Sequence, residues 1–169
     1  MNTNKELISV AVITYNSSDT IIDTLESILN QSYGSLNIEL VISDDASTDN
    51  TIKIIEVWLE INSAKFHAIN LIKNTVNQGV SRNINVAWKA VNTMWVKAIA
   101  GDDLLELSCI EDNMCFVIDN INCNIVFSKM QHFGDSDKIT PVPYHIKFFE
   151  LTAEKQYKYL KYFSFNIAP

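Results

Sequence analysis

The chain has 169 residues, 47% of them hydrophobic, and a formal net charge of −7. This composition is that of an ordinary globular protein with one sizeable core, and the acidic balance argues against a nucleic-acid groove or a polybasic membrane patch. No stretch approaches the roughly 20 apolar residues of a transmembrane helix, and the first residues lack a signal-peptide pattern. We therefore expect a cytoplasmic protein without a transmembrane segment.

The first half of the chain predicts alternating strands and helices. Apolar, β-branched runs predict strands over 7–15, 38–43 and 67–73. Each is followed by a turn and by apolar residues at helical spacing, which predict a helix. The expected apolar faces are Ile21, Ile22, Leu25, Ile28 and Leu29 for the first helix, Ile52, Ile55, Trp58 and Leu59 for the second, and Val80, Ile84, Ala87 and Val91 for the third.

A fourth strand, 95–100, leads into Gly101 and two adjacent carboxylates, Asp102 and Asp103. Strands that alternate with helices predict an α/β fold with a mostly parallel sheet and helices on both faces. The remaining chain predicts a helix with Leu107, Ile110, Met114 and Val117 on its apolar face, a fifth strand over 124–129 and a helix over 152–162.

The cysteines and histidines show no pattern of a metal site. The cysteines have neither metal-ligand spacing nor an even-numbered framework, and we interpret them as small buried residues in a reducing compartment. The histidines lack acidic partners, so we expect them to be structural or exposed. These residues are Cys109, Cys115, Cys123, His67, His132 and His145.

Polar residues stand at the carboxyl ends of three predicted strands, where open α/β sheets bind ligands. They are Thr14 and Tyr15, Asp44 and Asp45, and Asp102 and Asp103. Residues 77–79 open the third helix and precede Arg82, the only arginine of the chain. Helix amino ends and arginine both favour phosphate.

Two adjacent carboxylates repel each other, so a fold keeps them together more easily when a cation neutralises them. Oxygen ligands suit Mg²⁺ or Mn²⁺, which complete their coordination with water and substrate phosphates. Asp102 and Asp103 therefore predict a site for a metal and a diphosphate.

Five segments together resemble the inverting family two glycosyltransferases, which have the GT-A fold. The match extends in order and spacing over roughly residues 8–105. Its segments are 10–16 (VAVITYN), 27–33 (SILNQSY), 39–49 (ELVISDDASTD), 77–83 (NQGVSRN) and 101–103 (GDD), the last where the family has its metal-binding DxD-type motif.

The resemblance implies a nucleotide-diphospho-sugar transferase-like fold and a role for each matched residue. Glycine replaces the first acid of the metal-binding motif, so two carboxylates are available and not three. The implied roles are Thr14 and Tyr15 beside the nucleotide base, Asp45 hydrogen-bonded to the base, Arg82 near the base or diphosphate, Asp102 facing ribose and metal, and Asp103 binding the metal.

Some of these residues also have structural alternatives. Asp102 and Asp103 could form a turn and a helix cap, Tyr15 could pack at the core edge, and Arg82 could be a solvated charge. Asp45 could also be a cap, but Ser47 and Asp49 are predicted to cap the second helix, which would leave Asp45 free.

The family resemblance leads us to expect one GT-A domain over 1–169, with a nucleotide-binding half at roughly 7–105 and an acceptor-side part, 106–169, that is incomplete. Family members use an Asp or Glu base from a later segment to deprotonate the acceptor. The acids after the fifth predicted strand stand in no recognisable base motif, so we expect the base beyond the chain end. These acids are Asp135, Asp137, Glu150 and Glu154.

The implied enzyme is a glycosyltransferase of hexosyltransferase type. It would move a sugar from a UDP- or dTDP-type donor to an acceptor hydroxyl with inversion, assisted by Mg²⁺ or Mn²⁺. By analogy, the acceptor is a glycan or a lipid-linked molecule of surface polysaccharide synthesis, and the sequence leaves peripheral attachment to the inner face of the membrane open.

Three alternatives stay open. The first is a non-catalytic nucleotide-sugar-binding fragment. A nucleotidyltransferase on a related fold would need a glycine-rich, basic loop after the first strand, where 16–19 has neither glycine nor a cation. A phosphoacceptor receiver module would need an acid pair there, where Thr14 and Tyr15 stand.

Overall fold

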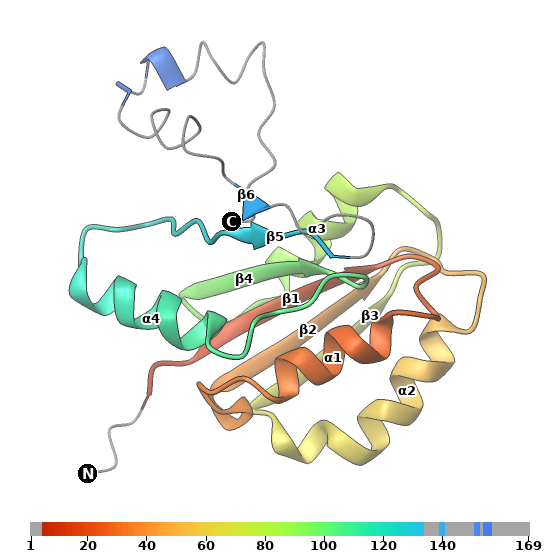
Figure 1. Ribbon diagram of the computed structural model, residues 1–169. Helices are drawn as coiled ribbons and strands as arrows, with labels where there is room; N and C mark the ends of the chain where they lie inside the picture. The colour runs from red at the N-terminus through yellow and green to blue at the C-terminus, as the bar shows by residue number, and fades with distance from the viewer. Residues whose placement is uncertain (1–4, 134–138, 141–150, 153, 157–169) are drawn as a thin grey trace. The chain divides into compact units, whose positions relative to one another are not determined.

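The computed structural model describes residues 5–133, 139–140, 151–152 and 154–156. The chain forms two compact units, Met1–Phe116 and Val117–Pro169. The strands are β1 (Ile8–Thr14), β2 (Ile38–Asp44), β3 (Ala68–Lys73), β4 (Trp95–Ala100), β5 (Met130–Gln131) and β6 (Ile139–Thr140) (Figure 1). The α-helices are α1 (Ile21–Leu29), α2 (Thr51–Asn62), α3 (Val80–Lys89) and α4 (Cys109–Asp119), with short 3₁₀ turns η1 (Ser35–Asn37) and η2 (Ser63–Lys65).

The first unit is built on a parallel sheet with the strand order β3-β2-β1-β4. The strands pair in register, so that Ile13 lies opposite Ser43 on one side and Ala100 on the other. The chain winds outward from β1 through β2 to β3 and then returns to the opposite side of β1. The strand order therefore reverses between β1 and β4, the position where open α/β sheets bind ligands.

Helices cover both faces of this sheet, as predicted (Figure 1). On one face, Val10, Val12 and Leu40 pack with Leu25 of α1 and Ile55 of α2 in the main core. On the other face, small residues let α3 approach closely, with Ala87 packed against Ala11 and Val41. The alternation of the two cores along each strand follows from the two-residue period of β-structure.

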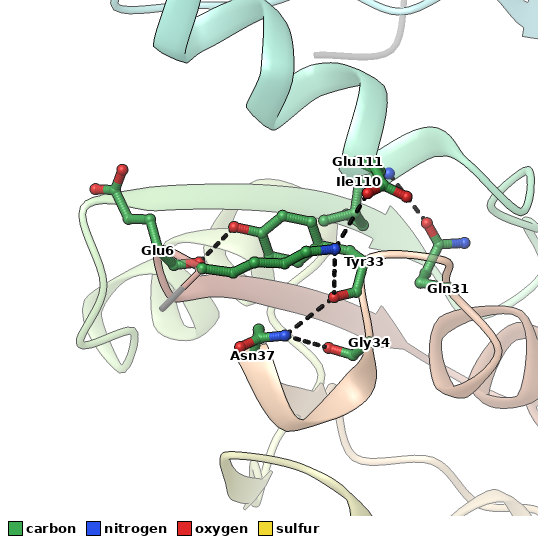
Figure 2. A network of polar contacts seen from close by, with 8 residues as sticks. Glu6, Gln31, Tyr33, Gly34, Asn37, Ile110 and Glu111 are labelled. Carbon is green, nitrogen blue, oxygen red and sulfur yellow. Dashed lines mark hydrogen bonds and ion pairs between the residues drawn. The ribbon is translucent and has the colours of Figure 1, made fainter. Parts of the chain in front are cut away.

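A polar cluster fixes the segment between α1 and β2. The Tyr33 hydroxyl donates to the carbonyl of Glu6 at 2.6 Å, and Asn37 Nδ2 donates to the carbonyl of Tyr33 at 3.0 Å (Figure 2). Lys5 lies over the Tyr33 ring, 4.6 Å from its centroid, and pairs with Glu111 at 3.1 Å. Burial, with the nearby acids and Cys115, raises the pKa of Tyr33, so the ring stays neutral and serves as a structural anchor.

The predicted fifth strand over 124–129 is wrong. Residues 123–127 have no regular structure, and the short β5 pairs antiparallel with β6. Ile125 and Phe127 are 65% and 47% exposed, so the apolar side chains of this run do not form a buried face. Asparagines at 120, 122 and 124 favour turns over a strand here.

Further expectations about burial are wrong. Ile22, expected on the apolar face of the first helix, is 37% exposed. Val80 is 70% exposed in the first turn of α3, and Leu107 is 61% exposed because α4 begins two residues later. Cys115 is exposed, and Cys109 and Cys123 are partly exposed, so none of the cysteines is a buried core residue. Local periodicity marks the faces of a helix but not the residues at its end.

Two remaining predictions concern the second unit and membranes. Of the helix predicted over 152–162, residues 154–156 are helical and Thr152 is not, while residues 153 and 157–162 lie outside the described residues. In the described part of the chain, no helix is long and apolar enough to cross a membrane.

Candidate functional site

The loops after β1 and β2 are bonded to each other. Asn16 adopts a left-handed conformation with φ of 51°, which asparagine tolerates better than most residues. Its side-chain oxygen accepts from the amide of Thr48 at 2.8 Å, and its own amide donates to Ser47 Oγ at 2.8 Å. Asp45 N donates to the carbonyl of Thr14 at 2.9 Å. The ends of β1 and β2 thus form one connected surface.

Asp45 is not free, contrary to the expectation from capping. The residue is only 3% exposed, and its carboxylate accepts from the amides of Gln78 at 3.0 Å and Gly79 at 2.8 Å. Asp49 does accept from the amide of Thr51, the first residue of α2, at 2.9 Å. Ser47, however, bonds to the carboxylate of Asp44 and not to the helix. Asp45 therefore ties the end of β2 to the turn that opens α3.

The start of α3 presents Arg82 to solvent. Gly79 has φ of 83° at the helix N-cap, a conformation that favours glycine. Arg82 is exposed, and its Nη1 donates to Gln78 Oε1 at 3.2 Å. No carboxylate of the described residues pairs with it. Buried Asn83 fastens the helix to β2, since it accepts from Ser43 Oγ at 2.6 Å and donates to the Ser43 carbonyl at 3.0 Å.

The turn after β4 fits tightly against the end of β1. Gly101 N donates to the carbonyl of Ile13 at 2.9 Å, and Asp103 N donates to the carbonyl of Ala100 at 3.2 Å. A Cβ on Gly101 would lie 3.0 Å from Thr14 Oγ1 and 3.2 Å from Ile21 Cδ1. A side chain at position 101 would therefore require its neighbours to shift by a few tenths of an ångström.

Asp102 and Asp103 do not cap a helix. Both side chains are exposed, and α4 begins only at Cys109. Among the described residues, neither carboxylate accepts a hydrogen bond. The structural alternative of a turn with a helix cap is thus excluded, and the two acids are available to a ligand.

The electrostatics of this turn favour a cation. Although Asp103 is exposed to solvent, partial desolvation of its carboxylate, followed by the charge of the neighbouring Asp102, raises the pKa of Asp103, and Lys97 partly opposes this effect. Lys97 lies on β4 with only 6% of its side chain exposed, and burial lowers its own pKa. A bound divalent cation would favour the ionised form of Asp103.

The oxygen atoms of the aspartate pair suit a hard divalent ion whose remaining ligands come from water and phosphate. Asp102 and Asp103 offer only oxygen, which suits Mg²⁺ or Mn²⁺. In the part of the chain that the structure describes, no group of three or more His, Cys, Asp or Glu side chains could hold a metal ion. The pair would therefore leave most coordination positions to water and phosphate oxygens.

Strand register brings most of the predicted site residues to one edge of the sheet. Thr14 is buried at the end of β1, and its Oγ1 is the one buried side-chain polar atom of the described residues without a hydrogen-bond partner. Tyr15 follows it with 46% of its side chain exposed, so it is not a core residue. Asp45 stands after β2, next to β1, and the Asp102–Asp103 turn stands after β4 on the other side.

The downstream acids give no assignment of a base. Asp135, Asp137 and Glu150 lie outside the described residues, and Glu154 is exposed in the second unit. The expectation that the general base lies beyond the chain end stays a prediction.

Sequence reasoning missed two features of the site. Lys97 lies beside the aspartate turn, and its charge in an otherwise apolar strand was an available signal. Polar residues on one side of α1 also contact this turn, and their helical spacing was visible in the sequence: they are Thr20, Thr24 and Ser27, with Gln31 after the helix.

Comparison with known proteins agrees with this geometry. The sequence profile described as Glycosyl transferase family 2 matches residues 9–168. The chain is 36% identical over 112 residues to the UDP-Glc:alpha-D-GlcNAc-diphosphoundecaprenol beta-1,3-glucosyltransferase WfaP of Escherichia coli, which covers 66% of the chain and 41% of the relative. It is 38% identical over 99 residues to the abequosyltransferase RfbV of Salmonella typhimurium, covering 59% of the chain and 29% of the relative. The chain thus spans less than half the length of these relatives.

Solved structures of two proteins have the same fold. A fragment of TarS from Staphylococcus aureus, in complex with UDP, has a TM-score of 0.61 at 28% identity, over 68% of this chain and 33% of that one. The mannosyltransferase PcManGT from Pyrobaculum calidifontis, in complex with GDP-Man and Mn²⁺, has a TM-score of 0.63 at 25% identity, over 77% and 37%. The predicted α/β fold of the GT-A class is confirmed.

Proposed function

The chain belongs to glycosyl transferase family 2, and on this premise we propose that it is the donor-binding part of an enzyme that moves a sugar from a nucleotide-diphosphate sugar to an acceptor hydroxyl. The transfer inverts the anomeric centre and is assisted by Mg²⁺ or Mn²⁺. The acceptor is a glycan or a lipid-linked molecule of surface polysaccharide synthesis. The name of the Escherichia coli relative, which includes a diphosphoundecaprenol-linked sugar, supports the lipid-linked class.

One observation carries this proposal: Asp102 and Asp103 are exposed, cap no helix and stand where the strand order reverses. Like charges at adjacent positions cost free energy that a cation offsets. Two carboxylates fill only part of an octahedral coordination shell. We therefore expect the diphosphate of the donor to supply further oxygen ligands to the metal.

Different residues of the site bind different parts of the donor. Asp103 and Asp102 hold the metal and the diphosphate, with Asp102 also facing the ribose. A divalent cation bound there supplies positive charge for the leaving diphosphate. Arg82 places a fixed positive charge close to the Asp45-held turn, near the base or the diphosphate.

Thr14, Tyr15 and Asp45 form the base end. The Asp45 carboxylate keeps acceptor capacity beyond its bonds to two amides, which supports a hydrogen bond from a base N–H. The exposed Tyr15 ring offers a stacking surface at the same strand end.

Calorimetric titration with UDP, with and without Mn²⁺, tests the proposal. We expect wild-type binding to depend on Mn²⁺ and Asp103→Asn to weaken it by at least about tenfold, because one charged ligand is lost. Asp23→Asn is the matched control, since Asp23 is an exposed acid of α1. Binding that ignores both Mn²⁺ and Asp103→Asn would refute the metal site, and parallel titrations with dTDP and GDP identify the base.

The same protein can be tested against the alternative of a non-catalytic nucleotide-sugar binder. Release of UDP from UDP-glucose or UDP-GlcNAc, with and without added acceptor glycans, separates the two. Donor binding without any turnover would favour the binder.

A further inference from the structure

A polar stripe on α1 faces the segment that carries the aspartate pair. The stripe consists of Thr24 and Ser27 in the helix, with Thr20 at its N-cap and Gln31 just after it, at successive spacings that place all four on one side. The other buried face of α1 is apolar and packs in the main core through Ile21, Leu25 and Ile28. Thr24 and Gln31 are almost fully buried, with 0% and 4% exposed.

Successive residues of the stripe form hydrogen bonds with successive positions of the segment 101–110. Thr20 Oγ1 donates to the carbonyl of Gly101 at 2.8 Å, and Thr24 Oγ1 donates to the carbonyl of Asp103 at 2.8 Å. Further along the same segment, Ser27 Oγ accepts from the amide of Leu105 at 3.1 Å.

Gln31 is the last residue of the stripe, and its side-chain amide both donates and accepts a hydrogen bond. Its Nε2 donates to the carbonyl of Glu106 at 2.8 Å. Its Oε1 accepts from the amide of Ile110 at 3.0 Å (Figure 2). Residues 102–106 form no helix or strand, so side chains of α1 provide the hydrogen bonds that regular structure would otherwise provide.

The amino end of α1 is tied to the other half of the site. Ser17 N donates to Thr51 Oγ1 at 2.8 Å, and Ser18 N donates to Asp49 Oδ2 at 3.1 Å. Thr51 begins α2, directly after the loop that carries Asp45. One helix thus connects the base end of the site with the aspartate turn.

We propose that Thr20 and Thr24 are positioning residues, whose hydroxyls place the backbone of Gly101 and Asp103 so that the two aspartates can share a metal with the donor diphosphate. The position of the turn can be measured in the protein without ligand. The consequence for donor binding rests on the proposed function. Both hydroxyls donate to backbone carbonyls, so their effect on the metal would act through the turn. A lost hydroxyl would let the carboxylates move, and metal binding is sensitive to displacements of this kind.

Three variants test the proposal. Thr24→Val and Thr20→Val keep the branched shape and remove the hydroxyl, while Thr24→Ser keeps the hydroxyl. Thr93→Val is the matched control, since the Thr93 hydroxyl also donates to a backbone carbonyl, that of Trp95 at 2.6 Å, at the start of β4 and away from the turn.

Two measurements are made on each variant. Hydrogen–deuterium exchange of residues 101–106 in the metal-free protein reports the placement of the turn. Titration with UDP in the presence of Mn²⁺ reports its consequence. In Thr24→Val and Thr20→Val we expect amide exchange at residues 101–106 to rise. We expect the affinity for UDP in the presence of Mn²⁺ to fall by about fivefold to tenfold, because one hydrogen bond is lost. Thr24→Ser should keep the wild-type exchange at 101–106 and the wild-type affinity for UDP. Thr93→Val should also leave both unchanged, even if it lowers the stability of the protein.

The outcomes separate this inference from the proposed function. Unchanged exchange at 101–106 in both valine variants would overturn the positioning role. Raised exchange with unchanged affinity would show that the turn moves without affecting the metal, which also overturns it. A wild-type protein that binds no UDP would refute the proposed function and the donor part of this inference, while exchange would still decide whether α1 places the turn. If Thr24→Val does not fold, Thr20→Val, at a partly exposed position, gives the same decision.

Discussion

Replacing Gly101 by alanine tests whether the aspartate turn is held by close packing. The added Cβ would lie 3.0 Å from Thr14 Oγ1, 3.1 Å from Thr14 Cβ and 3.2 Å from Ile21 Cδ1. These distances are shorter than the roughly 3.5–4.0 Å of ordinary carbon contacts. Thr14 Cβ is attached to β1, which is paired on both sides, so it cannot give way. The Ile21 methyl group can move more easily.

Two effects of opposite sign decide the size of the change. Overpacking costs typically about 1–3 kcal/mol, whereas alanine restricts the unfolded chain and stabilises by about 0.4–1 kcal/mol. Gly101 has no positive φ, so no left-handed strain adds to the loss. We expect Gly101→Ala to lower the free energy of unfolding by about 1–2 kcal/mol, or the melting temperature by roughly 2–8 °C.

Urea unfolding of single and double variants checks this reasoning. Ile21→Val alone should cost about 1 kcal/mol, but less in the Gly101→Ala background, because it removes the atom that clashes. Gly79→Ala is the contrasting control: it meets no atom within 4 Å but has φ of 83°, so its cost comes from backbone strain and should not couple to Ile21→Val. A Gly101→Ala protein as stable as the wild type, or more stable, would refute the packing argument.

Three further predictions concern buried polar groups. Burial raises the pKa of Glu39, but hydrogen bonds from Asn92 and Ser9 lower it overall. Its stabilising effect is therefore complete above about pH 4.3 and is lost as pH falls through the lower folded pKa. Glu39→Gln should cost roughly 2 kcal/mol at pH 7 and less at pH 3, and an equal gap at both pH values in urea unfolding would contradict this. Asp45→Ala should cost about 2 kcal/mol and raise amide exchange at residues 78–79, whose N–H groups lose their acceptor; unchanged exchange there would be inconsistent with the bonds described. Asn83→Ala should cost about 2–3 kcal/mol in thermal unfolding, because it leaves polar groups of the β2 end unpaired, and a loss below about 0.5 kcal/mol would exclude that role.

Hydrophobic pattern predicted the sheet and the first three helices because these signals are local. The strands expected over 38–43 and 67–73 differ from β2 and β3 by a residue at one end, and the apolar faces of α1 and α2 lie largely in the core. The pattern failed at 124–129, where Ile125 and Phe127 are 65% and 47% exposed and no strand forms. Periodicity reports which residues a segment could bury and does not report whether the fold buries them.

The positions of the candidate site residues were also predictable. Parallel strands end at the same edge of a sheet, so polar residues after successive strands must come close. This holds for Thr14, Asp45 and the Asp102–Asp103 turn. Their partners were not predictable. The capping argument left Asp45 free, yet its carboxylate accepts from Gln78 and Gly79, which lie on another loop.

The sequence by itself determined the parallel α/β architecture, the family and the edge of the sheet at which the candidate site residues gather, because each depends on residue type and on spacing along the chain. Only the tertiary structure decided what holds the site in place. Thr24 and Asp103 are 79 positions apart, and Asp45 and Gly79 are 34 apart. No local pattern encodes such pairs, since they form only when the packing of α1 and α3 on the sheet brings the segments within hydrogen-bonding distance.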